Sequence, residues 1–279
     1  SERQVRPGEH NRCEEPPAIL RNVNSGTEVS ISIKMRSDVS VAPPCTDLSL
    51  EKWENAFQRK KDEHATLGTS FVAASFPVRE VSFAVHSTDP SQCATIKRAT
   101  LRLAQDLSLG VGGCLWDCGI RIAQFLGEHI GIVADRRVLE LGSGTGVAGL
   151  AAASCGAAIV VLTDLPELIS LLEQNVTANG LAATAVVCSY AWGSLVDTRC
   201  AGSDASSDSA HEKHLSGSAA FDVVICCDCS YCCNEVAASE DLLAALLRFV
   251  AGDTLLLLAH KRRGDDAELA LFQRLDEHF

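Results

Sequence analysis

A glycine-rich turn near the middle of the chain constrains its fold more than any other feature. Residues 138–146 read VLELGSGTG, a short apolar strand that runs into closely spaced glycines, and residues 147–155 continue as a helix of small side chains. Glycines allow the backbone to turn sharply and to approach a ligand closely. A strand, a glycine turn and a helix in this order are typical of open α/β sheets, which bind ligands at the carboxyl ends of their parallel strands.

The chain from residue 76 onward alternates strands and helices. Apolar and polar residues alternate at 81–85 and 100–103, which predicts a β-hairpin, and helical spacing follows at 116–130. Further strands are expected at 137–141, 158–163, 183–189, 221–227 and 254–259, and further helices at 147–155, 166–180, 235–250 and 268–278. This order predicts an α/β fold with a Rossmann-like, mainly parallel sheet and helices on both faces, preceded by the hairpin and an N-terminal extension.

Two regions depart from this pattern. Residues 1–75 lack sustained periodicity and contain proline pairs, so we expect a poorly ordered N-terminal extension with one helix at 48–65. Residues 76–279 form the predicted domain, interrupted by a mobile insertion at 199–220 that is rich in Ser, Ala, Asp and Gly.

Composition disfavours several kinds of partner. The formal net charge is −12 at pH 7, and because an acidic surface repels phosphate backbones, a basic protein fits better than a nucleic acid. The 13 cysteines are odd in number and many lie in apolar runs. This indicates buried thiols in a reducing compartment, with the cytoplasm expected ahead of the nucleus. No apolar run is long enough to span a bilayer, so we expect no membrane partner, and we expect a monomer.

The glycine turn fits two kinds of cofactor. Gly144, Gly146 and Gly149 satisfy the G-x-G-x-x-G pattern of dinucleotide-binding proteins, and Asp164 follows at about the required distance to bind a ribose. Glu140 points to another ligand, because a carboxylate beside the turn would repel a pyrophosphate and suit an ammonium group. S-adenosylmethionine carries such a group and no phosphate. A turn that only packs the helix against the strand is the remaining alternative.

Five motifs in order resemble those of the class I, seven-β-strand methyltransferases. Within that class they are similar to methyltransferase family 16, the METTL21-like protein lysine methyltransferases. The motifs are GGCLWD at 112–117, VLELGSGTG at 138–146, TDLP at 163–166 with the helix segment 173–179 behind it, AWG at 191–193 and DCSY at 228–231. The resemblance extends from about residue 81 to 279.

The resemblance implies a cofactor, S-adenosylmethionine, and a set of residues around it. Asp164 is expected to bind the ribose, Trp192 to contact the adenine region and Trp116 to close the pocket. The whole set of expected cofactor-binding residues is Trp116, Glu140, Gly142, Ser143, Gly144, Gly146, Asp164, Leu165, Trp192 and Cys227. Asp228 and Tyr231 are the expected catalytic residues, at the mouth where a target lysine enters.

The implied reaction is methyl transfer from a sulfonium to a neutral amine, in which positioning carries most of the rate. Free lysine has a pKa of about 10.4, and desolvation in a narrow apolar mouth would lower it. We expect Asp228 to orient the incoming ammonium or to hold a water that accepts its proton, and Tyr231 to offer a π-face or a hydroxyl. The predicted function is S-adenosylmethionine-dependent methylation of a lysine side chain in a protein.

Several alternatives stay open. The target could be a protein histidine or a small molecule, whereas the lack of an Asn-Pro-Pro-Tyr type motif after 221–227 disfavours nucleobases and glutamine. A catalytically silent binding module or a nicotinamide-dependent oxidoreductase could keep the same fold. Cys226 and Cys229 have C-x-x-C spacing, but the cysteines crowd one strand end, so no metal site is expected. Asp228 could simply cap the turn after its strand.

The chain also departs from the family. The resemblance implies a further antiparallel strand pair beyond the last predicted helix, and we expect no such pair within residues 1–279. The strand at 254–259 is therefore expected to form an exposed edge of the sheet. Neither the N-terminal extension nor the insertion at 199–220 is a family feature.

Overall fold

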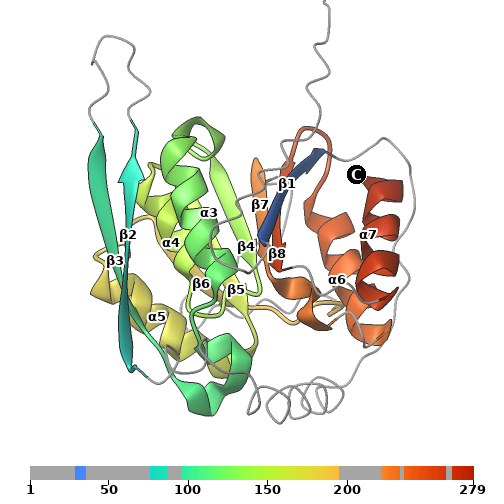
Figure 1. Cartoon of the computed structure of the whole chain (residues 1–279), viewed down its shortest axis with the longest axis horizontal. Helices are drawn as coiled ribbons and strands as arrows, with labels where there is room; N and C mark the ends of the chain where they lie inside the picture. Colours follow the sequence, from blue (N-terminus) through green and yellow to red (C-terminus); the bar gives the residue numbers. More distant parts are fainter. Residues whose placement is uncertain (1–28, 36–75, 87–95, 195–220, 233–235, 262–265) are drawn as a thin grey trace, which may run out of the picture.

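The computed structural model describes residues 29–35, 76–86, 96–194, 221–232, 236–261 and 266–279 (Figure 1). The strands are β1 (Val29–Met35), β2 (Val78–Val85), β3 (Lys97–Ala104), β4 (Arg137–Leu141), β5 (Ile159–Asp164), β6 (Ala185–Ser189), β7 (Val223–Cys227) and β8 (Leu255–Lys261). The α-helices are α3 (Asp117–Glu128), α4 (Val147–Ser154), α5 (Ile169–Ala178), α6 (Val236–Phe249) and α7 (Asp266–His278). Short 3-10 helices are η1 (Leu107–Gly113), η2 (Ile130–Ile132), η3 (Pro166–Leu168) and η5 (Cys229–Cys232).

The main sheet confirms the predicted α/β architecture. Its strand order is β1-β8-β7-β4-β5-β6, and all neighbours are parallel except β1, which runs antiparallel to β8. From β4 the chain builds outward to β6 on one side and then returns to the other side with β7. The order of strands therefore reverses beside β4. In open α/β sheets this switch point, at the carboxyl ends of the strands, is where ligands bind.

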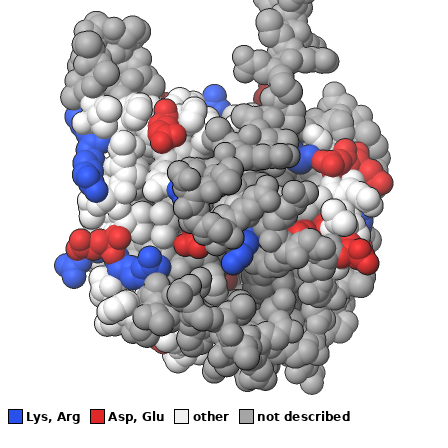
Figure 2. Space-filling view, viewed as in Figure 1, with Lys and Arg blue, Asp and Glu red and all other residues white. Residues whose placement is uncertain are grey.

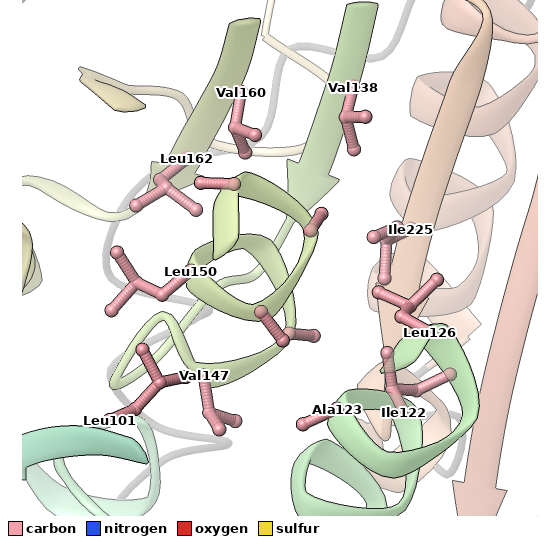
Figure 3. Close-up of a cluster of buried hydrophobic side chains, with 14 of the residues drawn as sticks. Leu101, Ile122, Ala123, Leu126, Val138, Val147, Leu150, Val160, Leu162 and Ile225 are labelled. Carbon is pink, nitrogen blue, oxygen red and sulfur yellow. The ribbon is translucent and has the colours of Figure 1, made fainter. Parts of the chain in front are cut away.

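Helices cover both faces of the sheet, as the alternation of buried strand residues requires. One hydrophobic core joins strand residues such as Val138 and Val160 to α3, α4, α5 and the β2–β3 hairpin, and a second core joins Leu139 and Val161 to α6 and α7. Figure 3 shows Leu150 of α4 close to β5 in the first core. The small side chains of α4 allow it to lie deep between the sheet and α3, so seven of its residues are buried.

Strand β1 corrects two expectations. Residues 29–35 were expected to lie in a poorly ordered extension, and β8 was expected to be an exposed edge, yet β1 pairs with β8 from Val29↔Lys261 to Met35↔Leu255. Ile31 is only 6% exposed and joins the first core, and Lys34 forms an ion pair with Asp276 of α7. The strand forms because its alternating apolar residues complete the core, while its backbone pairs with the N–H and C=O groups along the edge of β8. The expected helix at 48–65 and the insertion at 199–220 lie outside the described residues.

The β2–β3 hairpin is present as predicted and packs against α3. Gly127 of α3 permits a close approach, because a Cβ there would lie 1.9 Å from the carbonyl oxygen of Ala84, and the Gly127 carbonyl accepts a bond from His86 N at 2.9 Å. In the described part of the chain, none of the helices combines the length and apolar character required to cross a membrane.

Candidate functional site

The glycine turn after β4, residues 142–146, lies at the centre of the predicted site. Because the sequence predicts that this turn binds a cofactor, it is called the cofactor loop below. Gly142, Gly144 and Gly146 all have positive φ, at 64°, 55° and 80°, a backbone region that favours glycine. Ser143 N donates to the carbonyl of Thr163 at 2.9 Å, and the Ser143 hydroxyl accepts from Thr163 N at 3.0 Å. These two bonds hold the loop against the end of the neighbouring strand, β5.

Gly142 lies where the segments after β6 and β7 approach the loop. A Cβ at Gly142 would lie 2.8 Å from Cζ2 of Trp192 and 3.0 Å from Sγ of Cys229. The Cys229 thiol also donates to the carbonyl of Leu141 at 3.3 Å. The structure therefore brings Trp192 to the predicted loop. It adds Cys229, which sequence reasoning considered only as a metal ligand, although its place inside the DCSY motif was a signal.

The segment before α3 closes another side of the loop. The Gly112 carbonyl oxygen would lie 2.9 Å from a Cβ at Gly144, so the two backbones are in close contact. Trp116 is the N-cap residue of α3 and is half-buried, and its indole Nε1 donates to the carbonyl of Val111 at 2.7 Å. That bond holds the ring beside Val111, the residue before Gly112, at the start of α3.

Asp164 ends β5 beside the loop. Its Oδ2 accepts from Gly144 N at 2.7 Å and its Oδ1 accepts from Leu165 N at 2.8 Å. Burial of the carboxyl raises its pKa to about 6, although these two bonds act in the opposite direction. Leu165 is half-buried at the start of η3. Asp164 is thus a carboxylate oriented by the backbone, and its oxygens retain lone pairs for further donors.

The side chain of Glu140 is buried and turned toward the start of α4. It is 1% exposed, and its Oε2 accepts from Gly149 N at 2.9 Å, the third residue of α4. A Cβ at Gly149 would lie 2.7 Å from that oxygen and 2.2 Å from Leu162, so only glycine fits there. Burial raises the pKa of Glu140 to about 8. Its carboxyl satisfies one N–H of the helix start, and its role in selecting a ligand stays a prediction.

The end of β7 supplies the predicted catalytic segment. Cys227 is its last residue, and burial raises the pKa of its thiol well above the ordinary value, so the sulfur is neutral. Asp228 follows with φ of 55°, a strained conformation for a residue other than glycine, and strain of this kind clusters at functional sites. Its N donates to Ala259 O at 2.6 Å and its Oδ1 accepts from Lys261 N at 3.2 Å. The backbone of Tyr231 lies in η5, and its side chain is outside the described structure.

The described charges do not form a single patch on the face seen in Figure 2. Basic and acidic side chains lie close together there, including along the side where Figure 1 shows the hairpin. Among the described residues, no group of three or more His, Cys, Asp or Glu side chains could hold a metal ion. None of the seven cysteines whose side chains the structure describes forms a disulfide bond.

One family model and several curated relatives match this chain. The model is described as lysine methyltransferase and matches residues 95–278. Protein-lysine N-methyltransferase EFM3 of Chaetomium thermophilum is 30% identical over 161 residues, which cover 56% of this chain and 44% of the relative. Protein N-lysine methyltransferase METTL21A of Danio rerio is 29% identical over 173 residues, covering 61% of this chain and 70% of the relative.

A third relative has another target residue in its name. Histone-arginine methyltransferase METTL23 of Rattus norvegicus is 35% identical over 98 residues, which cover 34% of this chain and 43% of the relative. For both EFM3 and METTL23 the match spans less than half of the relative's length.

Proposed function

The chain belongs to the lysine methyltransferase family, as its motifs predicted, and on that premise we propose that it transfers methyl groups from S-adenosylmethionine to a lysine side chain of another protein. The observation that carries the proposal is the convergence of three neighbouring strand ends. The cofactor loop follows β4, Asp164 ends β5 on one side, and Asp228 follows β7 on the other. A carboxylate for the cofactor and one for the substrate thus flank a loop that has no side chains at Gly142 and Gly144.

The residues around the loop fit S-adenosylmethionine. Asp164 would accept hydrogen bonds from ribose hydroxyls, because Gly144 N and Leu165 N already hold its two oxygens in place. The backbone of the loop would bind the methionine end, with Trp192 beside Gly142 and the adenine region. When bound, this cofactor supplies an activated methyl group on a cationic sulfur.

The start of α4 argues against a dinucleotide. Rossmann proteins bind the pyrophosphate at the N-terminus of the helix after the glycine turn, where backbone N–H groups are free. Here the Glu140 carboxyl already accepts from Gly149 N and occupies that part of the helix end. The N–H of Gly149 is therefore not free to bind a pyrophosphate, which disfavours the nicotinamide-dependent alternative.

Asp228 is suited to hold the target amine. Its strained backbone and its two bonds to the end of β8 fix the direction of the carboxyl group. Asp228 would orient the incoming lysine ammonium, although a carboxylate by itself favours the charged form. Desolvation and the cationic sulfur of the cofactor would lower the lysine pKa, so that the neutral amine can attack the methyl group. The proton would leave through water. We propose a protein in place of a nucleic acid as substrate because the chain has a net charge of −12.

The test is transfer of labelled methyl groups. The purified chain would be incubated with methyl-labelled S-adenosylmethionine and a cell lysate, beside Asp164→Asn and, as a matched control, Glu173→Gln on the exposed side of α5. We expect label on a discrete protein, mapped to lysine, that disappears with Asp164→Asn and persists with Glu173→Gln.

Other outcomes would select another function. Label on arginine would favour the target named for METTL23, and label on histidine or a small molecule would change the target class. Calorimetry on the same samples separates the remaining cases. Cofactor binding without transfer to any acceptor indicates a silent binding module, whereas binding of a nicotinamide cofactor in its place would revive the oxidoreductase.

A further inference from the structure

Asn175 connects three elements from a fully buried position on α5. Its side-chain amide is 0% exposed, and Nδ2 donates to the carbonyl of Thr145 in the cofactor loop at 2.9 Å. The same nitrogen donates to the carbonyl of Ala104 in β3 at 3.2 Å, and Oδ1 accepts from Ala104 N at 2.7 Å. Burying a polar amide is unfavourable unless it is hydrogen-bonded. All three bonds go to backbone groups, so the side chain fixes the path of the main chain.

Asn179, one turn later on α5, repeats the two bonds that Asn175 makes to β3. Its Oδ1 accepts from Arg102 N and its Nδ2 donates to Arg102 O, both at 2.8 Å. Four residues of α-helix rise about 6 Å and two residues of a strand rise about 6.8 Å. Asparagines four apart can therefore pair with strand residues two apart. The two asparagines continue the sheet hydrogen bonds beyond β3, but only Asn175 also reaches the cofactor loop.

Two other hydrogen-bonded anchors of the cofactor loop come from β5. Ser143 bonds to Thr163 and Gly144 bonds to Asp164, and both partners belong to β5. Asn175 restrains the carbonyl of Thr145 from α5 instead. Without it, the turn between the ligand-facing glycines and α4 would lose its restraint on that side.

A second contact joins the hairpin to the opposite wall of the site. Gln105, directly after β3, accepts from Leu115 N at 2.8 Å and donates to Phe76 O at 2.7 Å. Asp106 N donates to the carbonyl of Gly113 at 2.9 Å. The end of β3 is thus bonded to the segment that leads to Trp116 as well as, through Asn175, to the cofactor loop.

We propose that Asn175 is a positioning residue for the cofactor loop. It joins the Thr145 carbonyl to the edge of β3, so that binding of the cofactor at the loop also stabilises the hairpin. This inference rests on the proposed binding of S-adenosylmethionine at the loop. It implies that cofactor occupancy is communicated to the hairpin, a surface remote from the reacting atoms.

The first test compares two equivalent substitutions. Asn175→Asp and Asn179→Asp each keep the size and the acceptor oxygen but replace donating N–H groups with carboxylate oxygens that face carbonyls. Losing a buried hydrogen bond in this way weakens ligand binding that depends on it by about tenfold or more. We expect Asn175→Asp to raise the dissociation constant and the KM for S-adenosylmethionine by at least that factor, with kcat at saturating cofactor little changed. Asn179→Asp should change both by less than about twofold.

The second test needs no substitution, so it holds even if Asn175→Asp fails to fold. Amide hydrogen exchange of the wild-type protein would be measured with and without S-adenosylmethionine. Cofactor binding should slow exchange at Ala104, which donates to Asn175, more than at Arg102, which donates to Asn179. If the cofactor binds but the exchange rates of these two amides change equally or not at all, the inference is overturned while the proposed function stands. If the wild-type chain binds no S-adenosylmethionine, the proposed function fails and the inference fails with it.

Discussion

Replacing Glu140 with glutamine should stabilise the protein increasingly as pH rises. Burial raises the pKa of this carboxyl from 4.5 to about 8. The folded state therefore binds the proton more tightly than the unfolded chain. Stability is lost as pH rises from the pKa that Glu140 has in the unfolded chain to the pKa that it has in the folded protein. Each tenfold difference in proton affinity corresponds to 1.36 kcal/mol, so the ionised group destabilises the folded state by about 5 kcal/mol. Glutamine keeps an oxygen to accept from Gly149 N and does not ionise.

The assay is urea denaturation of both proteins, without ligand, at several values between pH 5 and pH 7.5. The difference in free energy of unfolding should grow by about 3 kcal/mol over this interval, in favour of Glu140→Gln. Asp164, whose pKa is also raised, is present in both proteins, so its contribution cancels to first order. Glu173→Gln controls for the loss of one acidic side chain. Parallel curves for wild type and Glu140→Gln would refute the reasoning, because they would mean that the buried carboxyl does not resist ionisation.

Three further changes test other parts of the structure. Ile31→Ala should lower the free energy of unfolding by about 2–4 kcal/mol in urea denaturation, since Ile31 is 6% exposed and packs in the first core; no loss would mean that β1 does not dock in solution. Gly142→Ala should weaken S-adenosylmethionine binding by more than tenfold in calorimetry, because φ of 64° is strained for alanine by about 1–2 kcal/mol and its Cβ would lie 2.8 Å from Trp192; unchanged affinity would place the ligand elsewhere. Asp228→Asn should reduce methyl transfer by at least tenfold while cofactor affinity stays within about twofold, and equal losses in both would argue against a substrate role.

The sequence by itself determined the order of elements and predicted where the candidate site lies in that order. Apolar strands and amphipathic helices alternate along the chain, and each kind of element has its own spacing of apolar residues. This α/β order requires a parallel sheet covered on both faces. The glycine turn, Asp164 and Asp228 each follow a predicted strand, and parallel strands bring their carboxyl ends to the same edge. These features depend on local pattern and on one general rule of topology, so they could be predicted without coordinates.

Only the tertiary structure decided which distant groups meet. Strand β1 has the alternation Val29, Ile31 and Ile33, which could have revealed a strand, but not that it would pair with β8 or that Lys34 would reach Asp276, 242 residues away. Likewise, an acidic residue in a strand could face the ligand or the helix above it. Glu140 turned inward to Gly149, and Asn175 reached both β3 and the cofactor loop, because backbone groups buried by packing must find partners wherever the fold leaves them.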